Sequence, residues 1–136
     1  MTSINAATRS AIEALIAEYS WLLDHAGWSE LSDLCTPDLR MTMGGNVIEG
    51  VDGLAAWAVQ RAQRPERRTH HQTTNVRLVP GGNEQEVSGT VMLVLHVSNA
   101  GSDPAVEFVG EYQDRYVRIG DDWRFASRDV VPITRP

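Results

Sequence analysis

Lysine is absent from this sequence of 136 residues, since all 12 of its basic residues are arginine. A chain without lysine cannot form a Schiff base with a carbonyl substrate, bind phosphate through a Walker-type lysine or use lysine as a general base. Cysteine is nearly absent as well, because Cys35 is the only one. A single thiol excludes an internal disulfide and a metal site built from several thiolates.

The usual cofactor and metal motifs are missing too. No glycine-rich phosphate loop, dinucleotide fingerprint or Gly-x-Ser-x-Gly elbow occurs, and no His-x-His or His-Glu-x-x-His spacing is found. We therefore expect no metal and no cofactor. What remains is acid–base chemistry by side chains, or binding without chemistry.

Long apolar runs and an excess of positive charge are also lacking. No stretch approaches the roughly 18 apolar residues of a membrane helix, and residues 1–10 lack the basic-then-apolar pattern of a signal peptide. The net charge is -6, and no arginine-rich face with interleaved aromatics offsets it. These features predict a cytoplasmic protein with neither a membrane nor a nucleic-acid partner.

What the sequence does contain is a helical half followed by a stranded half. Apolar spacing predicts helices at about 12–23, 28–35 and 54–63, with Gly27 ending the first, the turn 36–38 closing the second and Asp52 capping the third. Alternating segments predict short strands on either side of the turn 44–46 and long strands at about 70–79, 86–98, 106–119 and 123–131. Short polar turns between the long strands indicate an antiparallel meander. The pattern predicts one α+β domain over residues 1–136, a cone-shaped, curved antiparallel (mixed) sheet wrapped around the N-terminal helices and enclosing a ligand cavity.

Three polar residues are unusual for a purely structural role. Asp24 falls in the last turn of the first helix, where a carboxylate meets the negative end of the helix dipole at a cost of about 0.3–1 kcal/mol. His70 and His71 begin a strand, so one of them faces the interior. His71 shares a face with Thr69 and Asn75, which predicts a polar pocket wall. The alternatives are a solvated Asp24 at the helix end and an outward-facing His71 with His70 packed inside.

Two further polar residues lie on apolar strands. His96 shares a face with Met92 and Val94, and we expect this row to line the pocket, although His96 alone could equally be a core histidine. Arg128 lies in the last strand, with Phe125 on the opposite face by parity. A buried arginine needs an anionic partner, which Asp24 or an acidic substrate could supply; a surface position is the alternative.

Aromatic and arginine-rich segments complete the candidates. Tyr19 and Tyr112 carry hydroxyls that need partners if buried, so they are better pocket candidates than most of the aromatic set, and Trp57 is expected to line the pocket from the third helix. The cluster of Arg61, Arg64, Arg67 and Arg68 is expected to keep the connection between helix and strand in solvent.

The order of these residues resembles one family. The resemblance covers nearly the whole chain and rests on motifs that are individually weak but occur in order. They are Tyr19 and Asp24 on the first helix, Trp28, Thr36-Pro37-Asp38, Gly50, His71-x-x-x-Asn75, Gly110-x-Tyr112-x-Asp114 and Gly120-Asp121-Asp122-Trp123-Arg124-Phe125-x-x-Arg128. This order is similar to the SnoaL-like branch of the nuclear transport factor two superfamily, and in particular to scytalone dehydratase, bile-acid dehydratase and hexachlorocyclohexane dehydrochlorinase.

The resemblance implies a catalytic set. Asp24 and His71 match the aspartate–histidine base of these enzymes, Arg128 matches a cavity arginine, Tyr19 a helix tyrosine and His96 a second histidine. A second tyrosine used by scytalone dehydratase has no counterpart here, which leaves the substrate undefined. In such a pair the carboxylate fixes the tautomer of the imidazole and stabilises the imidazolium.

The expected function is a cofactor-independent lyase or isomerase. His71 would remove a carbon-bound proton from a small, cyclic, largely apolar substrate, and water or another leaving group would depart. Two alternatives stay open: a SnoaL-type polyketide cyclase with the same residue roles, and a non-catalytic module that binds a ligand or acts as a dioxygenase β-subunit. The resemblance further implies a homodimer or homotrimer.

Overall fold

The computed structural model describes residues 3–133, so the first two and last three residues of the predicted domain lie outside the described residues. Within this range the chain forms two α-helices, one 3-10 helix and six strands. In chain order they are α1 (Ala6–Asp24), η1 (Trp28–Leu34), β1 (Cys35–Met43), β2 (Asn46–Glu49), α2 (Gly50–Ala62), β3 (Arg67–Pro80), β4 (Glu86–Asn99), β5 (Ala105–Ile119) and β6 (Asp122–Pro132). The predicted α+β class is confirmed.

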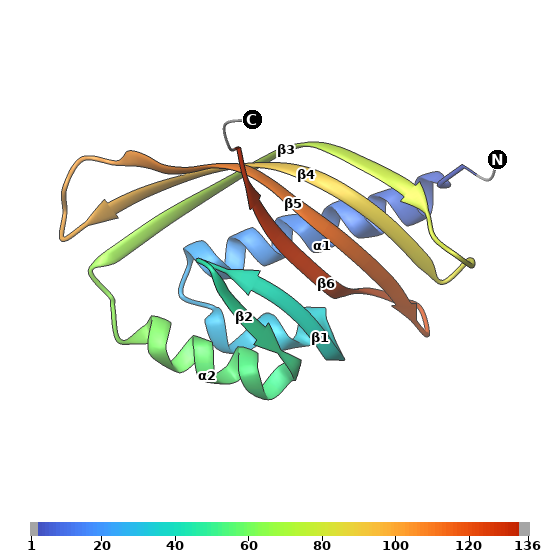
Figure 1. Cartoon of the computed structure of the whole chain (residues 1–136), viewed down its shortest axis with the longest axis horizontal. Coiled ribbons are helices and arrows are strands. Elements are labelled where there is room, and N and C mark those ends of the chain that lie inside the picture. Colours follow the sequence, from blue (N-terminus) through green and yellow to red (C-terminus); the bar gives the residue numbers. More distant parts are fainter. Residues whose placement is uncertain (1–2, 134–136) are drawn as a thin grey trace.

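The six strands form one sheet in the order β2-β1-β6-β5-β4-β3. Strands β3 to β6 are an antiparallel meander, as predicted, and β1 joins its edge by pairing in parallel with β6. Figure 1 shows the long strands arching over α1, with α2 below β1 and β2. The sheet curves around the helices, and its concave face holds the core.

Helix α1 carries the apolar face that the sheet covers. Asn5 caps it, because its side chain accepts a hydrogen bond from the main-chain nitrogen of Thr8 at 2.8 Å. The helix buries Ile12, Ile16 and Tyr19 almost completely and ends at Asp24, close to the start of β3. Its last carbonyls are partly satisfied when the nitrogen of Gly27 donates to the oxygen of Leu22 at 2.8 Å.

Three local predictions are wrong. Gly27 is not the residue that ends α1, because the chain leaves the helix through Ala26 with a φ of 60° and Gly27 has a φ of -90°. Thr36-Pro37-Asp38 does not form a turn but lies inside β1, which begins directly after η1. Asp52 does not cap α2, because the helix begins at Gly50 and Asp52 lies in its first turn. Gly50 adopts a φ of 70°, which lets the chain pass from β2 straight into the helix.

Three irregularities break the alternation of the long strands. Asn75 and Val76 lie opposite Val91 alone, and Asn75 has a φ of 56°. Glu107 is an extra residue, because Leu95 pairs with Phe108 while the next residue, His96, pairs with Val106. Ala126 is likewise extra between Phe125 and Ser127. Each bulge reverses the faces of the residues beyond it.

No helix within residues 3–133 is both long and apolar enough to cross a membrane.

Candidate active site

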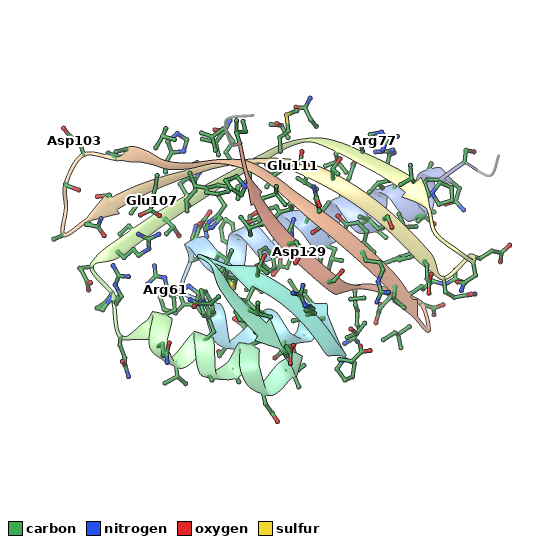
Figure 2. All side chains as sticks on the ribbon, in the orientation of Figure 1. Arg61, Arg77, Asp103, Glu107, Glu111 and Asp129 are labelled. Carbon is green, nitrogen blue, oxygen red and sulfur yellow. The ribbon has the colours of Figure 1, made fainter. Side chains whose placement is uncertain are left out.

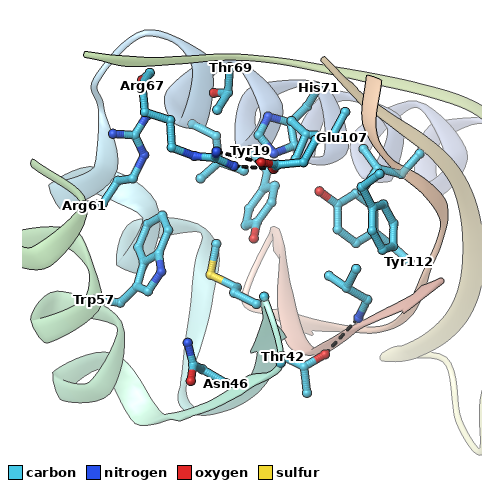
Figure 3. A pocket seen from close by; sticks show the side chains of 18 of the residues that line it. Tyr19, Thr42, Asn46, Trp57, Arg61, Arg67, Thr69, His71, Glu107 and Tyr112 are labelled. Atoms are coloured by element: carbon cyan, nitrogen blue, oxygen red, sulfur yellow. Dashed lines mark hydrogen bonds and ion pairs between the residues drawn. The ribbon is translucent and has the colours of Figure 1, made fainter. Parts of the chain in front are cut away.

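A cavity of about 880 Å³ lies between the concave face of the sheet, the C-terminal ends of α1 and α2 and the β1–β2 turn (Figure 3). This volume falls in the ordinary range for small-molecule pockets. Its apolar wall includes Leu23, Met43, Trp57, Leu93, Leu95 and Phe108. Its polar wall includes Tyr19, Thr42, Asn46, Thr69, His71, Tyr112, Glu107 and three arginines.

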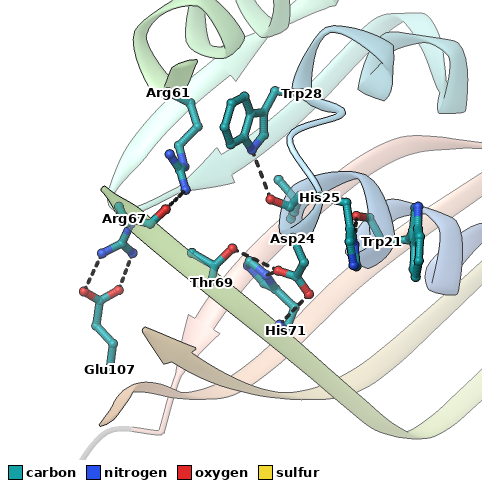
Figure 4. Close-up of polar contacts among 10 residues, drawn as sticks. Trp21, Asp24, His25, Trp28, Arg61, Arg67, Thr69, His71 and Glu107 are labelled. Atoms are coloured by element: carbon teal, nitrogen blue, oxygen red, sulfur yellow. Dashed lines mark hydrogen bonds and ion pairs between the residues drawn. The ribbon is translucent and has the colours of Figure 1, made fainter. Parts of the chain in front are cut away.

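Asp24 and His71 meet at this wall. The Oδ1 atom of Asp24 lies 2.6 Å from Nδ1 of His71, and its Oδ2 atom accepts the main-chain N–H of His71 at 2.8 Å. The hydroxyl of Thr69 donates to Oδ1 at 2.9 Å (Figure 4). The Asp24 side chain is 7% exposed and that of His71 11%. The carboxylate at the helix end is therefore held by three donors from β3.

These donors also set the protonation of the pair. Burial raises the pKa of the Asp24 carboxyl, but the hydrogen bonds from His71 and Thr69 outweigh burial and hold it below its usual value. An ionised carboxylate only accepts hydrogen bonds, so Nδ1 of His71 carries a proton, and in the neutral imidazole Nε2 is then the nitrogen with a free lone pair. Nε2 has no hydrogen-bond partner among residues 3–133. His71 thus lies where a proton acceptor could meet a ligand, whereas its neighbour His70 is exposed on the other face.

Tyr19 and Tyr112 form the polar part of the cavity floor. Their rings meet edge to face with centroids 6.1 Å apart. The hydroxyl of Tyr19 donates to the sulfur of Met41 at 3.3 Å. Burial raises the pKa of Tyr112 to about 12, and it also raises the pKa of Tyr19. Both phenols stay protonated at neutral pH, so Tyr112 can donate a hydrogen bond to a ligand oxygen.

Arg128 does not line the cavity, contrary to the expectation from the sequence. It is fully buried beneath the floor, where Nε donates to Oδ1 of Asp114 at 2.9 Å and Nη2 to Oδ2 at 3.3 Å. Its guanidinium lies 3.4 Å from the ring centroid of Tyr112 and 4.4 Å from that of Tyr19. The prediction that Asp24 could be the partner of Arg128 is wrong, because the bulge at Ala126 turns Arg128 toward its cross-strand neighbour Asp114. Arg128 supports the two tyrosines from below and reaches no ligand.

Four other expected pocket residues lie outside the cavity. Met92, Val94 and His96 project from the outer face of β4, because Val91, Leu93 and Leu95 point inward. Asn75 is exposed, since it sits in the bulge of β3. The predictions that Asn75, Met92, Val94 and His96 line the pocket are therefore wrong, whereas Tyr19, Trp57, His71 and Tyr112 do line it.

Three arginines and a glutamate line the cavity without having been predicted to do so. Arg61, Arg64 and Arg67 line it rather than only facing solvent, and Glu107 joins them. Figure 2 shows Arg61 and Glu107 toward the same end of the molecule, with Arg77 of β3 toward the other. Arg67 could have been found, because Arg67, Thr69 and His71 are alternate residues of one strand. Glu107 could not, because the bulge that turns it inward leaves no mark in the sequence.

The comparisons with known proteins agree with this architecture. The model of the SnoaL-like domain matches residues 5–129. The chain belongs to the SnoaL-like domain family. No curated protein matches the sequence.

Three solved structures illustrate how the SnoaL-like fold is shared. A variant of the Mycobacterium tuberculosis protein Rv3472, of unknown function, has 24% identity and a TM-score of 0.85, covering 96% of this chain and 79% of its own. A protein from Novosphingobium aromaticivorans, provisionally named a scytalone dehydratase, has 20% identity and a TM-score of 0.82, covering 94% and 85%. The hexachlorocyclohexane dehydrochlorinase LinA type 2 has 21% identity and a TM-score of 0.80, covering 94% and 86%. At these identities the likeness establishes the fold.

The described part of this SnoaL-like chain offers no cluster of three histidine, cysteine, aspartate or glutamate side chains suited to a metal ion. What the cavity brings together is one carboxylate–imidazole pair, two protonated phenols and a group of arginines.

Proposed function

We propose that this chain is a cofactor-independent lyase or isomerase that removes a carbon-bound proton with His71 as the base. The observation that carries the proposal is the 2.6 Å contact between Asp24 and Nδ1 of His71 at the cavity wall. A carboxylate in this position fixes the tautomer of an imidazole and stabilises the imidazolium that forms when Nε2 takes a proton. Asp24 orients the base, and His71 is the catalytic residue.

The reaction follows from these roles. Nε2 of His71 takes a proton from a carbon next to an activating carbonyl, and Tyr112 donates a hydrogen bond to the carbonyl oxygen as negative charge develops there. The electron pair of the broken C–H bond then forms a carbon–carbon double bond, and the leaving group departs with its own bonding pair. Where the leaving group is hydroxide, the imidazolium returns the proton and water is released. Positioned acid–base groups of this kind contribute typically 10²–10⁴-fold each.

The cavity supports a small, cyclic and largely apolar substrate. Leu93, Leu95, Phe108 and Trp57 give it apolar walls, and a volume of about 880 Å³ accommodates a molecule of two or three rings. Isomerisation and ring closure begin with the same proton abstraction, so a cyclase would use the same residues.

Proton exchange at an activated carbon tests the proposal without knowledge of the natural substrate. We expect the protein to accelerate deuterium incorporation at C1 of 2-tetralone in D₂O, measured by proton NMR. His71→Ala should reduce the protein-catalysed rate by about 10²–10⁴-fold, since the base is lost.

His70→Ala is the matched control, because His70 is the adjacent histidine on the outer face. It should leave the exchange rate unchanged, and circular dichroism should show both variants folded. An unchanged rate in folded His71→Ala would contradict the proposal and favour a binding module.

A further inference from the structure

Three arginines from one short stretch of chain stand together at one side of the cavity. Arg61 lies in the last turn of α2, Arg64 in the connection that follows and Arg67 at the start of β3. All three line the cavity, and we refer to them as the arginine rim. Figures 3 and 4 show Arg61 and Arg67 of this rim.

The rim is only partly neutralised by its neighbours. Arg67 forms a two-pronged ion pair with Glu107, through N–O distances of 2.9 and 2.5 Å. Arg61 directs its terminal nitrogens to the main-chain oxygens of Arg64 and Arg67, at 2.9 and 2.6 Å, and has no carboxylate partner among residues 3–133. The Arg64 side chain is 60% exposed, and its one carboxylate partner within residues 3–133 is Glu66, at 3.8 Å.

The arginine rim carries more positive than negative charge. Its three guanidinium groups face two carboxylates, Glu66 and Glu107, so one positive charge is unbalanced. Burial lowers the pKa of Arg61, and the positive charges of Arg67 and Arg64 lower it further. The chain as a whole carries a net charge of -6, so this local surplus runs against the average charge of the molecule.

The separation of the arginine rim from His71 along β3 sets the length that a ligand touching both would span. Arg67 and His71 are both inward residues of β3, four positions apart. At a rise of about 3.3 Å per residue, their Cα atoms are separated by about 13 Å along the strand. Apolar side chains, among them Leu93, Leu95 and Phe108, line the cavity as well.

We propose that the arginine rim binds a carboxylate of the substrate, which makes the substrate a cyclic apolar carboxylic acid. This inference rests on the proposed function for the role of His71, and it adds the substrate class. One unbalanced positive charge matches a monoanion, and guanidinium groups suit the planar, two-oxygen geometry of a carboxylate. The carboxylate lies between Arg64 and Arg61, and the ring system extends toward His71.

Binding of a matched pair of probes tests this without turnover. 2-Naphthoate and 2-naphthamide share one ring system and differ in charge, and isothermal titration calorimetry at low salt gives both dissociation constants. We expect naphthoate to bind about tenfold more tightly than naphthamide, since hydrogen bonds to charged groups are the stronger ones. The preference should weaken at high salt because Arg64 is exposed.

Variants of one exposed residue locate the site. Arg64→Gln should abolish the preference for naphthoate, and Arg64→Lys should retain most of it. Arg68→Gln is the matched control, because Arg68 is exposed and does not line the cavity. It should leave both affinities unchanged.

Equal affinity for the two probes, no saturable binding of naphthoate, or the same loss in Arg68→Gln as in Arg64→Gln would each overturn the proposal. These outcomes are independent of the base. If the protein prefers naphthoate and His71→Ala keeps the exchange activity, the arginine rim is supported as a carboxylate site and the proposed role of His71 as the base is contradicted.

Discussion

Asp24→Asn is expected to reduce turnover by about 10³–10⁴-fold while the fold persists. The reason lies in the donors around the carboxylate. Oδ2 accepts the main-chain N–H of His71, which cannot reverse its direction, so the carbonyl oxygen of an asparagine must take that position. The new amide nitrogen then faces Nδ1 of His71 and donates to it. His71 would carry its proton on Nε2, and the nitrogen that should accept the substrate proton would be blocked.

The measurement is the exchange rate of 2-tetralone in wild-type and variant protein, with Asp38→Asn as the control. Asp38 is exposed in β1 and makes no contact with the pair. Asp38→Asn should match the wild type, and an Asp24→Asn protein with more than a tenth of the wild-type rate would contradict the assigned tautomer.

The same carboxylate should contribute to stability in a pH-dependent way. Because the pKa of Asp24 is lower in the folded protein than in the unfolded chain, its ionised form stabilises the fold at pH values above about 4. That contribution is lost as the pH falls through the lower, folded value. Urea unfolding should therefore show a wild-type advantage over Asp24→Asn at pH 7 that narrows toward pH 3. A constant difference across this range would contradict it.

The sequence contained enough information for the fold and for the central pair. Helical spacing followed by alternating segments predicted the order of the elements, and the end of α1 was correctly assigned to the region of Asp24. His71 was preferred over His70 because its alternate neighbour, Thr69, is polar, and Thr69 does contact Asp24. The alternation of residues along β3 predicted the inward histidine correctly because the inner face of this strand is polar near the cavity.

The errors share one physical cause, which is local departure from strict alternation. A bulge at Asn75 removes that residue from the inner face, and one at Glu107 adds a residue to it. The bulge at Ala126 brings Phe125 and Arg128 to the same side, with the guanidinium 4.6 Å from the ring centroid, although their spacing had placed them on opposite faces. Bulges depend on pairing across strands, so a single strand's sequence does not specify them.

The prediction of which face of β4 lines the cavity was wrong for a different reason. Both of its faces are apolar from Val91 to Leu95, so hydrophobicity gave no sign of which row points inward. The structure turns Leu93 and Leu95 into the cavity and leaves Met92 52% exposed on the outer face. A polar residue in an apolar row suggests a pocket wall, but His96 lies on the outer face with Met92 and Val94.

Asp114→Asn is expected to lower the free energy of unfolding by about 3–5 kcal/mol, the usual range when one partner of a buried ion pair is removed. Both side chains of the Asp114–Arg128 pair are 0% exposed. Asp114 also accepts the hydroxyl of Tyr116 at 2.5 Å, so its carboxylate joins two residues of the core. Burial lowers the pKa of Arg128, whereas Asp114 and the surrounding tyrosines raise it. Because a guanidinium keeps its proton at neutral pH in any protein environment, the arginine stays charged when Asp114 is lost. An uncompensated guanidinium would then lie directly under Tyr112 and Tyr19.

Urea unfolding with two comparison variants separates this effect from a general loss of an ion pair. Asp129 pairs with Arg40 at 3.1 Å on the surface, where both side chains are at least 40% exposed, so Asp129→Asn should cost less than about 1 kcal/mol. The double variant Asp114→Asn with Arg128→Met removes both charges and should be more stable than the sum of its single substitutions implies, because the stranded cation is gone. Additive losses, or a cost for Asp114→Asn as small as that for Asp129→Asn, would show that the pair does not hold the cavity floor. If the coupling is found, the Arg128 guanidinium is a structural support for the tyrosines that face the substrate, and its contribution to turnover is indirect.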